Sequence, residues 1–308
     1  MKKHDRRLRN PRSIGIVCAI TATGLGLLYM AAAGAPKIYL AVNALSLVIG
    51  LALFAVTPST GLTSRLSGVM VIAFGVLLLA TAHFGVSVEG ASRWIRVGGL
   101  SLQTSLIVLP VMLLAFARCR GLLATIGMIL AGVALAVQPD RAMAGVLTAA
   151  LAVLALYRQD RWVVSTFAVA AAGFVTTVIR SDSLPAVPYV DQILYSSFQV
   201  HALAGIAVAA GALLLIVPSI VGQWLDSSNR EVHAVFGTVW LGMVVAAALG
   251  NYPTPLVGYG GSAILGYLLS LSSIPGRTAF AATAAEAAAP TDATTPRNRM
   301  DFHCEKAS

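Results

Sequence analysis

The chain has 308 residues and a formal net charge of +9, yet only 11% of its residues are charged and 57% are hydrophobic. A soluble domain carries about 25% charged and about 45–50% apolar residues, so this composition excludes an ordinary soluble protein, a disordered chain and a disulfide-stapled secreted scaffold. The positive charge lies in short pieces between apolar runs, like the loop charge of a membrane protein, which argues against nucleic-acid binding. The composition therefore predicts an all-α polytopic membrane protein.

Ten apolar runs follow one another along the chain, and a helix needs about 20 such residues to cross a bilayer. The fourth, fifth and sixth runs are short, so tilt or interfacial residues must complete their ends. The runs define a basic N-terminal tail at residues 1–13, a membrane domain at 14–276 and a mobile cytoplasmic tail at 277–308. We expect transmembrane helices at residues 14–33, 38–57, 67–86, 103–117, 121–137, 142–157, 162–180, 192–222, 233–250 and 262–275.

The basic residues are distributed unequally between the two sides of these ten helices. Of the 21 Lys and Arg residues, sixteen fall on the side of the N-terminus. Because cytoplasmic loops of membrane proteins are enriched in Lys and Arg, both termini are predicted to be cytoplasmic. The five on the other side are Lys37, Arg93, Arg96, Arg141 and Arg180.

Four segments on the predicted outer side concentrate glycine, proline, aromatic and charged residues. They are residues 89–95 (EGASRWI), 138–141 (QPDR), 185–191 (PAVPYVD) and 251–262 (NYPTPLVGYGGS). A carboxylate, cations and glycine-rich turns on one face are what a chemical site at a membrane surface requires. The alternative is that these residues form plain turns and an interfacial aromatic belt.

Four motifs in these segments occur in a fixed order, namely GASRWIRVGGLSLQ, QPD, VPYVDQIL and PLVGYGGS. Together they resemble the SEDS family of FtsW, RodA and SpoVE, and the resemblance covers about residues 14–276. The resemblance implies a ten-helix glycosyltransferase of the bacterial inner membrane. Such a protein polymerises lipid II into peptidoglycan with a class B penicillin-binding protein, during cell division or cell-shape maintenance.

The resemblance also implies site residues, carried over one position at a time. Asp191 matches the family's essential aspartate and is the expected catalytic residue. The motifs further imply substrate-binding roles for Arg93, Trp94, Gln103, Asp140, Pro188, Tyr259, Gly260, Gly261 and Ser262.

The implied reaction asks for a base and for positive charge. A sugar hydroxyl attacks an anomeric carbon as an isoprenyl pyrophosphate leaves, and a general base at Asp191 is worth about 10²–10⁴ in rate. The outer cations Arg93, Arg96 and Arg180 could neutralise the pyrophosphate, so Arg96 and Arg180 join the expected substrate-binding set. A divalent cation on Asp191 or Asp140 could assist, although no spacing specifies one. Alternatively, Asp140 is the N-cap of the sixth helix.

The chain departs from the family pattern in ways that keep other functions open. The acid of the family's QPSE segment is Leu106 here, and the paired glutamates after the essential aspartate are Gln199 and Val200. The long outer loop before Asp191 is reduced to about eleven residues after Arg180. A non-catalytic relative that binds lipid II or a penicillin-binding protein as a regulator is therefore an alternative. A transporter of lipid-linked precursors is a lesser one, because no predicted span holds a charged residue well inside it.

Overall fold

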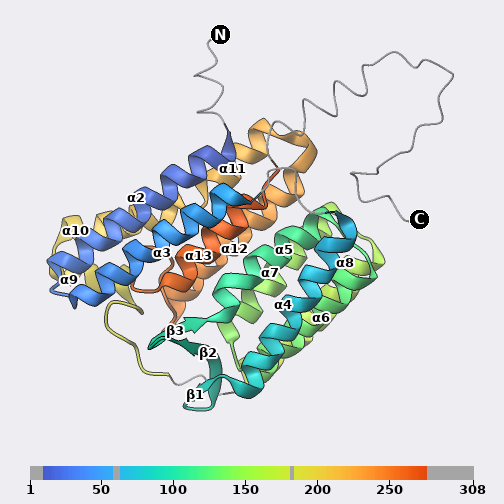
Figure 1. The fold of residues 1–308 in the computed structure, drawn as a ribbon, viewed down its shortest axis with the longest axis horizontal. Helices are drawn as coiled ribbons and strands as arrows, with labels where there is room; N and C mark the ends of the chain where they lie inside the picture. Colours follow the sequence, from blue (N-terminus) through green and yellow to red (C-terminus); the bar gives the residue numbers. More distant parts are fainter. Residues whose placement is uncertain (1–9, 58–62, 181–183, 276–308) are drawn as a thin grey trace, which may run out of the picture.

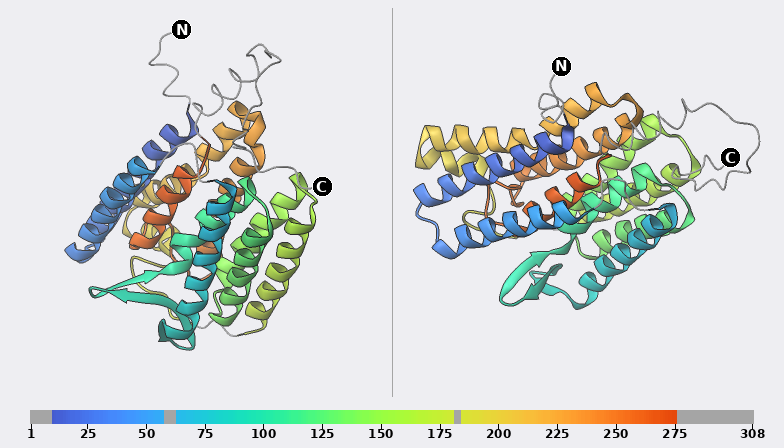
Figure 2. Two further views of the ribbon diagram at one scale, coloured as in Figure 1. Left: turned by 45° about the vertical axis from the view of Figure 1, so that its right-hand side comes forward. Right: turned by 45° about the horizontal axis from the view of Figure 1, so that its top comes forward.

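The computed structural model describes residues 10–57, 63–180 and 184–275. It is an elongated bundle of helices with a small sheet at one end (Figure 1; Figure 2). The predicted C-terminal tail and most of the predicted N-terminal tail lie outside the described residues. The helices are α2 (Pro11–Ala32), α3 (Lys37–Val56), α4 (Ser64–Phe84), α5 (Thr104–Arg118), α6 (Leu122–Val137), α7 (Arg141–Tyr157), α8 (Arg161–Ile179), α9 (Ile193–Val200), α10 (Ala202–Leu214), α11 (Val217–Leu225), α12 (Arg230–Leu249) and α13 (Gly261–Ser272), with a 3₁₀ turn η1 (Ser227–Asn229).

Helix length and composition identify a multi-pass membrane protein. Among the described residues, six helical stretches are long and apolar enough to cross a bilayer. Four shorter apolar helices, α5, α6, α7 and α13, accompany them, and three of these were predicted to be short from their sequences. The six longer stretches are Pro11–Ala32, Lys37–Val56, Ser64–Phe84, Arg161–Ile179, Ala202–Leu225 and Ser227–Leu249.

The helices form two groups that meet along a buried seam. On one side α4, α6, α7 and α8 pack together, and on the other α2, α3, α10, α11 and α13 do so (Figure 1). The groups meet where α13 packs on α5 and where α12 packs on α7 and α5. The helix α13 approaches α5 closely, because a Cβ added to Gly266 would lie 2.0 Å from the backbone oxygen of Leu106. A small residue at this crossing therefore lets two short helices bury almost all of their surface.

The all-α prediction is wrong for one segment, which folds as a three-stranded antiparallel sheet in the order β1-β2-β3. The sequence predicts an outer loop for this segment. Figure 1 shows the sheet at the end of the bundle where α4 ends and α5 begins. Its strands are β1 (Val86–Val88), β2 (Ala91–Val97) and β3 (Leu100–Gln103).

Two tight turns explain why this segment becomes a sheet. Glu89 and Gly90 join Val88 to its partner Ala91, with φ angles of 48° and 83°. Gly98 and Gly99 connect β2 to β3, with φ angles of 55° and 84°. Two successive residues with positive φ are characteristic of the type I′ turn that closes a two-residue hairpin. The Gly-Gly pair thus carried a hairpin signal within the motif.

The predicted helix at 192–222 is also corrected, because it is divided into α9, α10 and α11. The first break is His201, whose backbone is extended (φ −167°, ψ 145°) and whose Nδ1 accepts a hydrogen bond from the Leu203 N–H at 3.1 Å. Beyond the break α10 packs against α9. The ring of Phe198 lies over Gly205, where an added Cβ would be 2.3 Å from it. A second break precedes Pro218, which lies in the first turn of α11.

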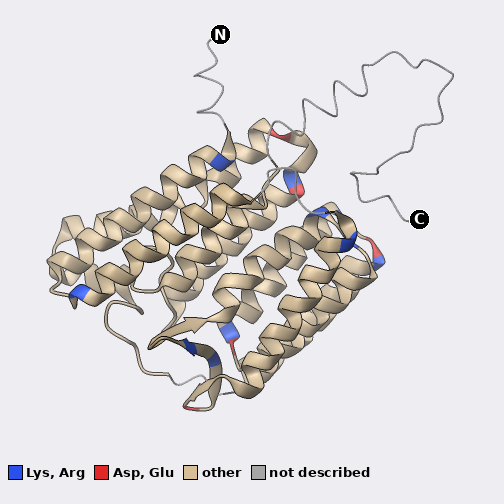
Figure 3. Ribbon diagram, in the orientation of Figure 1, with Lys and Arg blue, Asp and Glu red and all other residues tan. Residues whose placement is uncertain are grey.

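The charged residues of the described chain lie near the ends of the helices, and the middle of the bundle has none (Figure 3). Helix direction assigns Arg65 and Arg230 to the end where α2 begins, and Lys37 and Arg141 to the end where it finishes. These two sets match the two sides expected from the sequence. Which end faces the cytoplasm stays a prediction.

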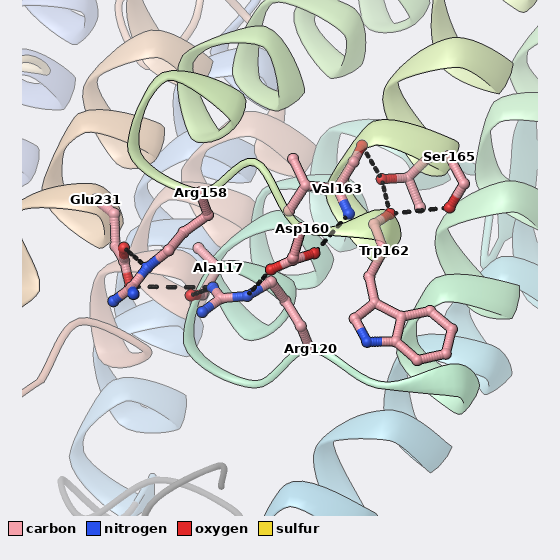
Figure 4. A network of polar contacts seen from close by, with 9 residues as sticks. Ala117, Arg120, Arg158, Asp160, Trp162, Val163, Ser165 and Glu231 are labelled. Carbon is pink, nitrogen blue, oxygen red and sulfur yellow. Dashed lines mark hydrogen bonds and ion pairs between the residues drawn. The ribbon is translucent and has the colours of Figure 1, made fainter. Parts of the chain in front are cut away.

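Ion pairs join three connections at the end where α2 begins (Figure 4). Arg120, between α5 and α6, lies with its Nε 3.0 Å from Asp160 Oδ2, before α8. Arg158 Nε lies 2.6 Å from Oε2 of Glu231, in the first turn of α12. Asp160 also caps α8 by accepting a hydrogen bond from the Val163 N–H at 3.0 Å. This end of the molecule is therefore tied by charges that neutralise one another.

Candidate functional site

Asp191 lies in the connection between α8 and α9 and is 9% exposed. Its Oδ2 accepts a hydrogen bond from the Val187 N–H at 2.9 Å, and its own N–H donates to the Val187 oxygen at 3.0 Å. Pro188 and Tyr189, with φ 63°, lie within this turn. Burial raises the pKa of the Asp191 carboxyl, and the Val187 N–H opposes that rise. In the described part of the chain no cation pairs with it.

The loop at residues 251–260 is joined to this turn by backbone hydrogen bonds. Asp191 forms an isolated antiparallel bridge with Pro253. Beside the turn, Gln192 Nε2 donates to Asn251 Oδ1 at 2.6 Å. The structure thus brings together two of the predicted segments, the one with Pro188 and Asp191 and the one with Tyr259 and Gly260. The backbone hydrogen bonds run from Thr254 N–H to Val190 O at 3.1 Å and from Tyr259 N–H to Tyr189 O at 2.7 Å.

Helix α3 forms one wall of this region, although the sequence analysis assigned it no site residue. Asn43 is fully buried, and its Nδ2 donates to the Gly258 oxygen at 2.8 Å while its Oδ1 accepts from the Gly260 N–H at 3.1 Å. One turn earlier, the ring of Tyr39 stacks on that of Tyr259, with centroids 3.8 Å apart. An amide inside an otherwise apolar span was the signal that could have found this wall, since intramembrane polar residues face protein partners.

A second polar cluster surrounds Asp140, which is fully buried. Its Oδ2 accepts hydrogen bonds from Gln103 Nε2 at 3.1 Å and from Ser105 Oγ at 2.9 Å. Its Oδ1 accepts from the Met143 N–H at 3.3 Å, which makes it the N-cap of α7, as the alternative interpretation had it. Ser105 was not among the residues predicted for the site.

The two clusters are connected through the start of α13. The Gln103 N–H donates to Ser262 Oγ at 3.0 Å, so the strand that ends at Gln103 is fixed to the helix that follows Tyr259 and Gly260. Gly261 lies between these contacts, and its Cα faces Ser46 of α3, whose Oγ would be 2.2 Å from an added Cβ. The predicted residues of three motifs therefore form one continuous structure.

The three residues of β2 that were expected to bind substrate do not share one environment. Arg93 is only 3% exposed, and its guanidinium donates to the backbone oxygen of Pro139. Trp94 is half-buried in the middle strand, opposite Gln103 in the register, and Arg96 is exposed. Arg93 thus fastens the sheet to the turn that carries Asp140, whereas Arg96 is accessible.

Arg180 is exposed after the end of α8 and is held there by α6 and α7. Its Nη1 donates to the Ala136 oxygen at 3.2 Å, and its own oxygen accepts from Arg141 Nη2 at 2.7 Å. None of its described contacts joins it to Asp191. The structure therefore does not group Arg180 with the catalytic candidate.

The expected help from a divalent cation finds limited support in the carboxylates. Both oxygens of Asp140 accept hydrogen bonds from protein donors, so this residue does not fit the role of a metal ligand. Within the described ranges, no three His, Cys, Asp or Glu side chains come together.

Solved structures have a similar fold. The crystal structure of the Thermus thermophilus rod shape determining protein RodA superposes with a TM-score of 0.58 at 20% identity, covering 85% of this chain and 94% of that chain. An aspartate-to-alanine mutant of that protein gives a TM-score of 0.58 at 19% identity, covering 85% and 95%. No protein-family profile and no curated protein sequence matches the chain.

The class defined by these observations is a multi-pass membrane protein with the fold of RodA. The resemblance to the SEDS family that the four motifs predicted is confirmed at the level of the fold.

Proposed function

We propose that the chain is a SEDS-family peptidoglycan glycosyltransferase of the bacterial inner membrane, which polymerises lipid II during cell division or cell-shape maintenance. The observation that carries the proposal is the environment of Asp191. In a RodA-like fold, this carboxylate is largely buried, has a raised pKa, and has one oxygen fixed by a backbone N–H.

Asp191 acts as general base in this proposal. The hydroxyl proton of the acceptor sugar moves to Asp191 as the sugar oxygen forms a bond with the anomeric carbon of the donor. The bond from that carbon to the pyrophosphate oxygen breaks, and its electron pair leaves with the pyrophosphate. Burial makes the carboxylate a stronger base, and the Val187 N–H on Oδ2 leaves Oδ1 for the proton.

The leaving pyrophosphate needs a cation, and Arg96 is the residue that we assign to it. Arg93 and Arg180 donate to backbone oxygens at Pro139 and Ala136, whereas Arg96 is exposed on β2. Two of the three arginines expected to bind the pyrophosphate thus bind backbone oxygens instead. This favours the second candidate function, a non-catalytic relative that regulates a class B penicillin-binding protein or binds lipid II.

The proposal includes a topology. The four shorter helices cross the membrane together with the six longer ones, which gives ten passages, cytoplasmic termini and an outward-facing Asp191. The alternating direction of the helices and the charge sets at the two ends support it. A class B penicillin-binding protein is the proposed partner.

The decisive experiment compares Asp191→Asn with the wild-type protein in liposomes that contain fluorescent lipid II, with and without the penicillin-binding protein. Asn retains the size of Asp but is not a base, so polymerisation should fall by at least about 10²-fold. The folded yield should not fall. Burial raises the pKa of Asp191 in the folded protein, so the stability that the protonated carboxyl contributes is present at low pH and is lost as pH rises through that pKa. The ionised carboxylate therefore destabilises the folded protein, and Asn removes this destabilisation.

The matched control is Asp160→Asn at the opposite end of the molecule. Asp160 caps α8, and Asn is an equally good N-cap, so this variant should polymerise at the wild-type rate. Undiminished product from Asp191→Asn would refute its catalytic assignment. A wild-type protein that binds lipid II but makes no product beside its partner would support the regulator instead.

A further inference from the structure

Three tyrosines from three separate segments meet beside Asp191. Tyr39 comes from α3, Tyr189 from the turn before Asp191 and Tyr259 from the loop after α12. The rings of Tyr39 and Tyr259 are stacked, with centroids 3.8 Å apart and planes inclined by 11°. Tyr189 meets Tyr39 edge to face at 6.2 Å. All three are half-buried, so part of this aromatic cluster is open to a ligand.

The cluster is held rigidly from behind. The Asn43 amide forms hydrogen bonds with the residues on both sides of Tyr259, to the Gly258 oxygen and from the Gly260 N–H. The Tyr189 hydroxyl donates to the Ala33 oxygen at 3.2 Å, at the end of α2. A buried amide that uses its donor and its acceptor on one loop fixes the loop with little freedom. The rings are therefore preorganised.

The exposed edge of the stack is polar. In the part of the chain that is described, neither the Tyr39 nor the Tyr259 hydroxyl is hydrogen-bonded to protein, so both can serve a ligand. Burial and the neighbouring Tyr39 raise the pKa of the Tyr259 phenol, which therefore stays neutral and able to donate. A pyranose ring matches such a surface, because it has an apolar C–H face that packs on an aromatic ring and a rim of hydroxyls.

A lone tyrosine at the same end offers a contrast. Tyr195 on α9 is 58% exposed, has no aromatic partner among the described residues, and donates its hydroxyl to the Ala248 oxygen at 2.9 Å. This is what a membrane-interface tyrosine requires. The stacked pair has a different construction, since its hydroxyls are not used by the protein.

We propose that the stacked Tyr39 and Tyr259 rings form a saccharide-binding platform beside Asp191. The platform holds a sugar unit next to the donor and acceptor sugars that react. The platform rests on the proposed function for its substrate class, a lipid-linked or polymeric N-acetylated sugar. Tyr189 and Asn43 position the rings without contacting the sugar.

The test uses two probes with the full-length protein in detergent or liposomes. Binding of the tetramer of N-acetylglucosamine is followed by saturation-transfer NMR, and turnover of fluorescent lipid II is followed where it occurs. Tyr39→Leu removes the stack and the aromatic face on which the sugar packs, so we expect binding to weaken about tenfold. The KM for lipid II should rise by a similar factor while kcat holds. Tyr39→Phe keeps the stack and should bind within about twofold of the wild type.

Tyr195→Leu is the matched control and should bind the tetramer as the wild type does. The platform would be overturned if the wild type did not bind the tetramer, if Tyr39→Leu and Tyr195→Leu behaved alike, or if Tyr39→Phe lost as much binding as a folded Tyr39→Leu. If Tyr39→Leu does not fold, loss of binding in folded Tyr39→Phe overturns it. Binding that depends on Tyr39 without any turnover of lipid II would support the platform while defeating the polymerase.

Discussion

The two ends of the bundle differ in how their charged side chains are paired. At the end where α2 begins, Arg120, Arg158, Asp160 and Glu231 neutralise one another across three connections (Figure 4). At the other end, Asp191 is largely buried and its described partner is a backbone N–H. The first arrangement fastens helices, whereas the second keeps a carboxylate in a state that costs the folded protein free energy. Because buried carboxylates with a shifted pKa cluster at functional sites, the end that holds Asp191 is the candidate functional end.

The first prediction tests whether the two ends lie on opposite sides of the membrane. Cysteines introduced at Val97 and Gln159 are exposed at the site end and the ion-pair end, respectively. In spheroplasts, an impermeant maleimide should label Val97→Cys, and it should label Gln159→Cys only after permeabilisation, relative to the parent protein. The reverse pattern would invert the proposed orientation.

The second prediction concerns the pH dependence of polymerisation. A general base acts when it is deprotonated, so the rate should fall about tenfold per pH unit below the Asp191 pKa. An ordinary aspartate has a pKa of about 3.9. Because burial raises the pKa of Asp191, the fall in rate should begin at a higher pH than it would for an ordinary aspartate. Rates measured between about pH 4 and 8, with folding monitored in parallel, check this. A rate that is flat down to an ordinary aspartate pKa would contradict the role of burial.

The third prediction concerns the seam through which the two helix groups meet. Gly266→Ala would place a Cβ 2.0 Å from the Leu106 backbone oxygen, and overpacking of this kind costs about 1–3 kcal/mol. Gly24→Ala in α2 meets nothing within 4 Å and should be neutral or slightly stabilising, since Ala favours helix. Thermal unfolding in detergent compares the two variants. Equal stability would show that the seam is looser than described.

The smallest effect is expected at the ion-pair end. Glu231→Gln breaks the contacts with Arg158 and Arg120, and partly exposed pairs contribute at most about 1 kcal/mol. The destabilisation should shrink at high salt, because screening weakens these pairs. Unfolding measured at low and high salt checks this. A larger loss that salt does not change would show that this end depends on more than ion pairs.

Much of the helical layout could be predicted from the sequence, because an apolar run of bilayer length is itself the signal. The observed bounds lie within a few residues of the expected ones for nine of the ten runs. The motif residues Gln103, Asp140 and Ser262 were placed on one side, since each follows or precedes a helix end there, and the structure joins them by hydrogen bonds. The expected helix ran through the break at His201, although the sequence before it, with Gln199 and His201 close together, is more polar than the apolar run that follows.

The site was harder to predict where geometry, and not residue type, decides the role. The sequence puts Arg93, Arg96 and Arg180 on one side, but only the fold reveals that two of them donate to backbone oxygens. Strand alternation could have separated Arg93 from Arg96 if the Gly98 turn had been interpreted as a hairpin. The contribution of α3 depends on a contact with a loop more than two hundred residues away, which no local pattern encodes.

The break at His201 fixes where Asp191 lies relative to α10. As one straight helix, the 33 residues from Ile193 to Leu225 would measure about 50 Å, well beyond the about 30 Å of a hydrocarbon core. Because α9 folds against α10, Asp191 lies back along α9 by its eight residues, or about 12 Å, from the bend. The carboxylate therefore lies one short helix away from the bend. Under the proposed function, a site set back from the bend suits a lipid-tethered sugar, because the isoprenyl chain of that sugar stays in the bilayer.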